Sequence, residues 1–94
     1  METNFDIEEL ELDNAIKELL EDVKSIVVYN DEVNSFDHVI DCLVKYCKHN
    51  FVQAEQCAVI IHFNGKYAVK SGALDTLKPI KEALCDQGLT ATIE

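Results

Sequence analysis

The clearest pattern of apolar and polar positions in the chain predicts a helix over residues 36–48. Its apolar positions recur at i, i+3, i+4, i+7, i+8 and i+11, so they share one helical face. They are Phe36, Val39, Ile40, Leu43, Val44 and Cys47. Asn34 or Ser35 can cap the start of this helix. Immediately before it, the β-branched run over residues 25–29 predicts a buried strand, which ends at the turn-forming residues Asn30, Asp31 and Glu32.

The remaining pattern predicts two further helices and two further strands. In chain order they are a helix over 53–62, a strand over 66–70, a helix over 73–87 and a strand over 89–93. Gly65 can end the first of these helices in the left-handed conformation. Pro79 predicts that the second either starts late, near Thr76, or kinks. The order β-α-α-β-α-β favours an α+β domain with its helices on one face of a small sheet.

Charge is distributed unevenly along the chain. The 94 residues include 18 acids and 8 lysines, which gives a net charge of −10. Residues 1–24 hold nine acids and two lysines, and so account for −7 of that total. The apolar residues of the same segment would share one helical face, and they are Leu12, Ile16, Leu19 and Val23. We therefore expect an acidic N-terminal extension over 1–24, flexible or marginally helical, and a single folded domain over 25–94.

The composition also excludes several partners. The chain is acidic and has no arginine, so we expect no binding to nucleic acid or to an anionic membrane surface. No segment reaches the roughly 18 apolar residues of a membrane span, and the acidic start lacks the positive region of an export signal. We expect a cytoplasmic location, where thiols stay reduced. We interpret the four cysteines as small core residues, and they are Cys42, Cys47, Cys57 and Cys85.

Signatures of catalysis and of metal binding are weak. The sequence carries no phosphate-binding glycine loop, zinc-protease motif or serine-hydrolase motif, so we expect neither an enzyme nor a cofactor. His62 could pair with a cysteine nucleophile only if the fold brings the two together. A zinc site is an alternative, because His38 and Cys42 are four residues apart and Cys47 and His49 follow closely. The spacing of the two cysteines is unusual for zinc, and a second half-site is missing.

The most informative chemistry lies in Asn30 and Asp31, after the first strand, and His62, at the end of the second helix. They offer acceptor oxygens and one imidazole lone pair, and an ammonium group needs about three acceptors. This set therefore suits a single cationic head, beside an apolar wall formed by Val28, Val39, Ala58, Ile61 and Leu89. In the alternative, Asn30 and Asp31 only cap a turn and His62 only ends a helix. Residue types alone favour that alternative.

Four segments of the sequence resemble the ClpS adaptor family. They are Tyr29-Asn30-Asp31-Glu32, Phe36-Asp37-His38-Val39-Ile40, Ala54-Glu55-Gln56 and Ile61-His62-Phe63-Asn64-Gly65-Lys66. Members of that family show a (Y/V)ND(D/E) segment, a helix, an A-x-Q segment and an H-x-x-G-K segment. The resemblance covers about residues 26–94, and it is specific because the order and the spacing of the segments fit together.

The resemblance implies a non-enzymatic adaptor of the N-end rule, which recognises N-degrons. Such an adaptor binds proteins whose N-terminal residue is Leu, Phe, Tyr or Trp, and delivers them to an AAA+ unfoldase of the ClpA or ClpC type for proteolysis by the Clp protease. The family fold is a three-stranded antiparallel sheet with three helices, similar to the C-terminal domain of the ribosomal stalk protein. In the family, the N-terminal extension can enter the unfoldase pore.

Family roles transfer to this sequence by position. The residues that match the family's α-amino-group ligands are Asn30, Asp31 and His62. Apolar pocket positions are matched by Val39, Ile61 and Leu89. Three positions depart from the family: Asn34 stands where Thr is frequent, and Met is frequent at the positions of Phe36 and Ala58. A smaller wall residue enlarges the pocket and a larger entrance residue fills it, so the preference among Leu, Phe, Tyr and Trp stays open.

Two other function classes stay open beside the adaptor. A ribosomal-stalk-like interaction module would contact translation factors, but it gives no reason for the set of Asn30, Asp31 and His62. A small metal or thiol protein would carry stoichiometric metal. The adaptor interpretation alone predicts a pH dependence, because an ammonium ligand needs a neutral His62 and histidine changes its charge near neutral pH.

Overall fold

The computed structural model describes residue 16 and residues 22–94, and the fold is given for these. The elements in chain order are β1 (Val23–Tyr29), α2 (Phe36–Cys47), α3 (Phe51–Asn64), β2 (Lys66–Ala73), α4 (Leu74–Asp86) and β3 (Thr90–Ile93). Within this part of the chain the order is the predicted β-α-α-β-α-β, and the prediction of an α+β fold is confirmed. The predicted extension over 1–24 lies mostly outside the described residues, so the division at residue 24 stays a prediction.

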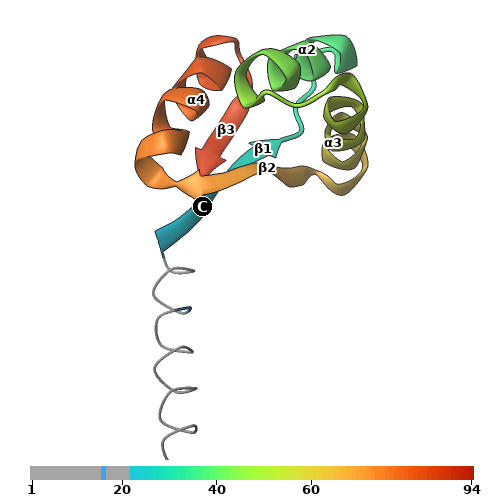
Figure 1. Cartoon of the computed structure of the whole chain (residues 1–94). Coiled ribbons are helices and arrows are strands. Elements are labelled where there is room, and N and C mark those ends of the chain that lie inside the picture. Colours follow the sequence, from blue (N-terminus) through green and yellow to red (C-terminus); the bar gives the residue numbers. More distant parts are fainter. Residues whose placement is uncertain (1–15, 17–21) are drawn as a thin grey trace, which may run out of the picture.

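The sheet has β1 in its centre, in the order β2-β1-β3, and both pairings are antiparallel. The helices cover one face of this sheet (Figure 1). The β-branched residues Ile26, Val27 and Val28 give β1 its central place, because each is less than a tenth exposed. The strand begins at Val23, two residues before the predicted start.

A bulge in β2 links the sheet to the connection between α2 and α3. Ile26 pairs with Lys70 whereas Val27 pairs with Ala68, so Val69 is the extra residue of β2. The Val69 carbonyl lies 2.6 Å from His49 Nε2. Because a carbonyl can only accept, this nitrogen carries the proton, and His49 satisfies a polar group that the bulge removes from the ladder.

The helix boundaries follow from side-chain caps. Of the two predicted caps for α2, Ser35 is the one that acts, and its hydroxyl accepts from the backbone N–H of His38 at 3.1 Å. Helix α3 begins two residues earlier than predicted, because Asn50 and Gln53 form a reciprocal capping box. Gly65 ends α3 with φ at 91°, as predicted.

Helix α4 corrects one prediction about its start. It begins at Leu74, five residues before Pro79, and not near Thr76. Pro79 is the sixth residue of α4 and has no N–H for the carbonyl of Asp75, so the helix continues through it with one backbone hydrogen bond fewer. The proline therefore lies within the helix, and α4 packs against the rest of the core through the fully buried Leu77 and Leu84.

The cysteines are free thiols, and three of them belong to the core. Cys42, Cys47 and Cys57 are buried, and Cys85 is half-buried. Burial raises the pKa of the Cys47 thiol to about 11. A thiol with so high a pKa stays protonated, so Cys47 acts as a small apolar residue. Among the described residues, no group of three or more His, Cys, Asp or Glu side chains could hold a metal ion.

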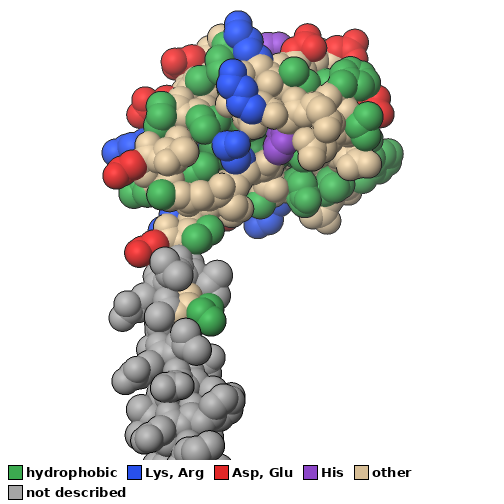
Figure 2. All heavy atoms as spheres, in the orientation of Figure 1, with side chains coloured by type: hydrophobic (Ala, Val, Ile, Leu, Met, Phe, Trp, Pro, Cys, Tyr) green, Lys and Arg blue, Asp and Glu red, His purple; other side chains and the backbone are tan. Residues whose placement is uncertain are grey.

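The folded part carries a mixed surface. On the face seen in Figure 2, lysine side chains gather near the middle and acidic side chains lie at the margins. None of the helices in the described residues is long and apolar enough to cross a membrane.

Candidate functional site

The connection between β1 and α2, residues 30–35, is held by the carboxylate of Asp31. Oδ1 of Asp31 accepts from the backbone N–H of Val33 at 2.9 Å and from that of Asn34 at 2.8 Å. This is an Asx turn, which aspartate forms with its own backbone. The first residue of the connection, Asn30, donates its backbone N–H to the Gly65 carbonyl at 2.8 Å. The connection is therefore tied to the end of α3.

Asn34 attaches the same connection to the turn between α4 and β3. Its Nδ2 donates to Asp31 Oδ2 and to the carbonyl oxygen of Gly88, each at 2.8 Å. Gly88 has φ at 91°, a conformation that favours glycine. The amide of Asn34 thus joins two segments that are 54 residues apart in the sequence.

The Asp31 carboxyl group is held in its charged form. The backbone N–H of Asn34 is the main cause that lowers its pKa, and the Asn34 side chain and the Val33 N–H add to this, while partial burial opposes it. The carboxylate therefore stays ionised through the neutral and mildly acidic range, and it supplies a negative charge at this position.

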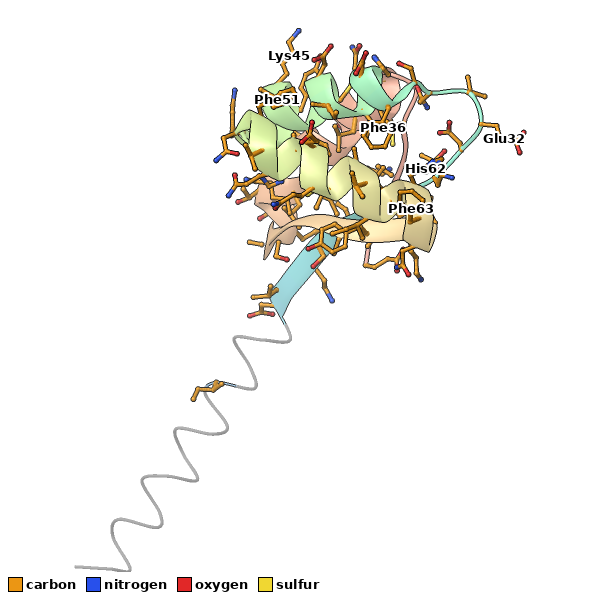
Figure 3. All side chains as sticks on the ribbon, turned by 90° about the vertical axis from the view of Figure 1, so that its right-hand side faces the viewer. Glu32, Phe36, Lys45, Phe51, His62 and Phe63 are labelled. Atoms are coloured by element: carbon orange, nitrogen blue, oxygen red, sulfur yellow. The ribbon has the colours of Figure 1, made fainter. Side chains whose placement is uncertain are left out.

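His62 lies on the exposed surface of the last turn of α3, between two aromatic rings. The Phe36 ring approaches it edge-on, with ring centroids 6.1 Å apart, and so does the Phe63 ring, at 5.0 Å. Figure 3 shows the three rings near this end of α3, with Glu32 farther out on the loop, while Phe51 lies at the other end of the helix. The imidazole is thus held by rings from α2 and α3.

A cavity of about 460 Å³ lies between these elements. Its lining joins polar side chains of the connection to apolar side chains of α2 and α3, and consists of Asn30, Asp31, Glu32, Asn34, Phe36, Val39, Ala58, Ile61 and His62. The volume falls within the range of pockets for small ligands. An apolar wall with a few converging polar groups at one side is the general arrangement of such pockets.

Eight of the ten residues singled out from the sequence line this cavity, and Val28 and Leu89 do not. Both of these are buried in the core, at 1% and 5% exposure. Their predicted contact with a ligand therefore stays a prediction. The structure brings together residues from β1's end, α2 and α3 that are up to 32 positions apart, from Asn30 to His62.

Glu32 is a lining residue that the reasoning from sequence did not select. It was interpreted only as a turn former after the first strand. Its position in the sequence, directly after Asn30 and Asp31, could have indicated this. Three consecutive turn residues belong to one loop, so a ligand that contacts the first two also lies near the third. With Glu32, the cavity carries two carboxylates.

The alternative grouping around His38 is a structural contact. His38 Nε2 lies 2.8 Å from the Gln87 carbonyl oxygen and 3.6 Å from Cys42 Sγ. The nitrogen must donate to the carbonyl, so it carries its proton. Burial is the main cause that raises the pKa of Cys42. A thiol that burial keeps protonated is not an activated nucleophile.

Comparison with known proteins places the chain among small α+β adaptor domains. A family model described as the ATP-dependent Clp protease adaptor protein ClpS matches residues 21–92. Among solved structures, the fold is similar to that of Agrobacterium tumefaciens ClpS2 bound to L-phenylalaninamide, with a TM-score of 0.75 at 16% sequence identity. That similarity covers 78% of this chain and 95% of the other. Curated proteins gave no match.

The chain belongs to the ClpS adaptor family. The family model spans most of the chain, and it contains every lining residue of the cavity. The resemblance drawn from the four sequence segments is thereby confirmed.

Proposed function

We propose that this protein binds the free N-terminal residue of substrate proteins and delivers them to a Clp unfoldase for degradation. The observation that carries the proposal is the cavity in which Asn30, Asp31 and His62 stand beside an apolar wall. One end of such a site suits a cation and the other suits a bulky apolar side chain. An N-terminal residue of a protein presents these two groups on a single carbon atom.

The α-amino group is held by three acceptors in this proposal. An ammonium has three N–H donors, which meet the Asn30 side-chain oxygen, Asp31 Oδ2 and the imidazole of neutral His62. Asp31 Oδ2 already accepts from Asn34 Nδ2 at 2.8 Å, and a carboxylate oxygen has a second lone pair for the ligand. The negative charge of Asp31 strengthens the contact, because hydrogen bonds between charged groups are the stronger ones.

The first side chain enters the apolar part of the cavity, which is bounded by Phe36, Val39, Ala58 and Ile61. Ala58 and Ile61 are buried, at 3% exposure each, whereas Phe36 at the entrance is 40% exposed. The cavity volume of about 460 Å³ is compatible with a large first side chain, and we propose Leu, Phe, Tyr and Trp as the residues bound. The solved relative binds L-phenylalaninamide, a molecule with a free α-amino group and an aromatic side chain, which supports the proposal.

The partner that receives the substrate is an AAA+ unfoldase of the ClpA or ClpC type, and residues 1–24 take part in delivery. Family membership supports this part of the proposal. The adaptor itself performs no chemistry on the substrate, and it needs no cofactor. A cytoplasmic location fits a protein whose partner is a cytoplasmic protease.

Fluorescence anisotropy with peptides that differ only in the first residue tests the proposal. We expect Leu, Phe, Tyr and Trp to bind at least tenfold more tightly than Ala or Glu, since each buries an apolar side chain worth about 1.5–3 kcal/mol. Equal affinities across all six peptides would contradict a pocket for the first side chain. Loss of degradation of a Phe-initiated protein without the adaptor then tests delivery.

A further inference from the structure

Phe63 is a large apolar side chain that folding leaves in solvent. It is 82% exposed, whereas Ile61, two residues earlier on α3, is 3% exposed. The side chain contributes little to the core. When a ligand covers an exposed phenyl ring beside a binding cavity, apolar surface leaves water and binding becomes more favourable.

The ring of Phe63 continues a row of aromatic side chains that starts in the cavity. Phe36 and His62 line the cavity, and their centroids are 6.1 Å apart. The His62 ring then meets Phe63 at 5.0 Å, edge to face at 81°. Phe63 itself is not a lining residue. The row therefore leads from the cavity wall to the open surface (Figure 3).

The second residue of a bound peptide would lie close to this row. The proposed function fixes the α-amino group at Asn30, Asp31 and His62. The next Cα along the chain lies about 3.8 Å from the first, so it cannot be far from the imidazole. A side chain of ordinary length on that second residue reaches a ring whose centroid is 5.0 Å from the imidazole centroid.

We infer that Phe63 forms, with the edges of Phe36 and His62, a second subsite that receives the side chain of the substrate's second residue. The inference rests on the proposed function, because the position of the first residue determines where the second one lies. The subsite favours a large apolar side chain. Phe63 offers only a hydrocarbon surface, and contact with it removes apolar area of both partners from water.

The expected effect is a preference within one series of peptides. Peptides that begin Phe-Leu or Phe-Phe bind about three- to tenfold more tightly than the peptide that begins Phe-Ala, which is the range of one aromatic or apolar side-chain contact. All three have an uncharged second residue, so the carboxylate of Glu32 does not contribute to the comparison.

The test measures these affinities by fluorescence anisotropy on the full chain and on two variants. Phe63→Ala removes the proposed subsite. Phe51→Ala is the matched control, because Phe51 is also an exposed phenylalanine on α3, at 60% exposure. Twelve residues of helix separate the two, which is about 18 Å. We expect the Leu-to-Ala ratio of affinities to fall to about one in Phe63→Ala and to keep its value in Phe51→Ala.

Three results would overturn the subsite. The ratio could be one in the unaltered protein, or unchanged in Phe63→Ala. Phe63→Ala could also weaken all three peptides by the same factor, which would mean that Phe63 only orients His62. If none of the peptides binds the unaltered protein, the proposed function itself fails and the subsite fails with it.

Discussion

At the scale of single residues, one carboxylate holds the loop of the candidate site and is also the proposed ligand of the α-amino group. Asp31 accepts three hydrogen bonds from Val33 and Asn34 of its own loop. An ionised carboxylate has about four acceptor positions, and the fourth is the one that a ligand would share with the Thr90 side chain, which also helps to lower the pKa of Asp31. The loop bonds hold the carboxylate in place, so the protein loses less conformational entropy when a ligand binds.

Removal of the His62 acceptor should weaken binding. In the proposed function the imidazole accepts one N–H of the α-amino group. We therefore expect His62→Ala to lose about tenfold or more in affinity for a peptide beginning with Phe, which is the value of one hydrogen bond to a charged group. Fluorescence anisotropy measures the effect.

A His62→Gln variant is the control, since glutamine keeps an acceptor oxygen at this position. We expect His62→Gln to bind the peptide more tightly than His62→Ala. Equal affinities of His62→Ala and the unaltered protein would show that His62 is not an acceptor.

Removal of the Asn34 amide should destabilise the loop in a pH-dependent way. Asn34→Ala removes the donor to Asp31 and Gly88, and we expect a loss of about 1–3 kcal/mol in the free energy of unfolding at pH 7. The pKa of Asp31 is lowered in the folded state, so its stabilising effect is present above the ordinary aspartate value and is lost as the pH falls through the folded value.

Urea unfolding of both proteins at pH 7 and at acid pH checks this. The difference in the free energy of unfolding between Asn34→Ala and the unaltered protein should shrink as the pH falls. Once Asp31 is protonated, the Asn34 amide stabilises it less, so the loss of that amide costs less. A difference of the same size at both pH values would mean that the bond to Gly88 carries the whole effect.

At the scale of elements, helix α3 supplies both the wall of the cavity and its proposed acceptor. Ala58 and Ile61 lie on its buried face, and His62 follows on its last turn. Gly65 ends the helix and accepts the backbone N–H of Asn30, so the end of α3 and the end of β1 are fixed to each other. One helix thereby sets the distance between the apolar and the polar part of the site.

Ala58→Met should narrow the range of accepted first residues. Ala58 is 3% exposed and lines the cavity, so a longer side chain has to fill part of the 460 Å³. Overpacking of a rigid site costs about 1–3 kcal/mol, and we expect Phe and Tyr peptides to lose more affinity than Leu peptides. Affinities for Phe, Tyr, Leu and Ile peptides that do not change on substitution would contradict this.

The elements were predictable where the signal is local. Periodicity identified each helix and strand, and Gly65 marked the end of α3 correctly. Apolar spacing does not reveal the capping box of Asn50 and Gln53, because the first residues of α3, such as Phe51 and Val52, are apolar and yet exposed. The start of α4 was uncertain since Pro79 reads equally as a helix stop or as a residue of an early turn.

The candidate site was predictable for a different reason. The chemistry of Asn30, Asp31 and His62 suggested a cation, but only the family resemblance connected two segments so far apart. The hydrogen bond from Asn34 to Gly88 joins residues 54 positions apart, and such a contact cannot be predicted from the spacing of apolar residues. Glu32 was likewise assigned to a turn, because a sequence pattern does not show which side of a loop faces a cavity.

At the scale of the whole molecule, the charge divides the protein into two parts. Residues 1–24 account for −7 of the net −10, so the domain that carries the cavity is only weakly acidic. The face in Figure 2 agrees with this, since lysines occupy its middle. The proposed recognition of an ammonium would therefore depend on the carboxylates at the cavity, and not on the total charge of the chain.

Deletion of residues 1–21 should separate binding from delivery. Strand β1 begins at Val23 and pairs with β2 from there, so this deletion leaves the sheet intact. We expect an unchanged affinity for Phe-initiated peptides and slower degradation of a Phe-initiated protein by the Clp protease. A truncated adaptor that supports degradation at the full rate would rule out a role of the extension in delivery.

The most direct measurement compares one peptide in two forms, with its N-terminal phenylalanine free or acetylated, by fluorescence anisotropy. Acetylation removes the positive charge and leaves the phenyl ring unchanged. If Asn30, Asp31 and His62 hold the α-amino group, the acetylated peptide should bind at least about a hundredfold more weakly, which is the value of two or more lost hydrogen bonds to a charged group. Equal affinities for the two forms would contradict recognition of a free N-terminus.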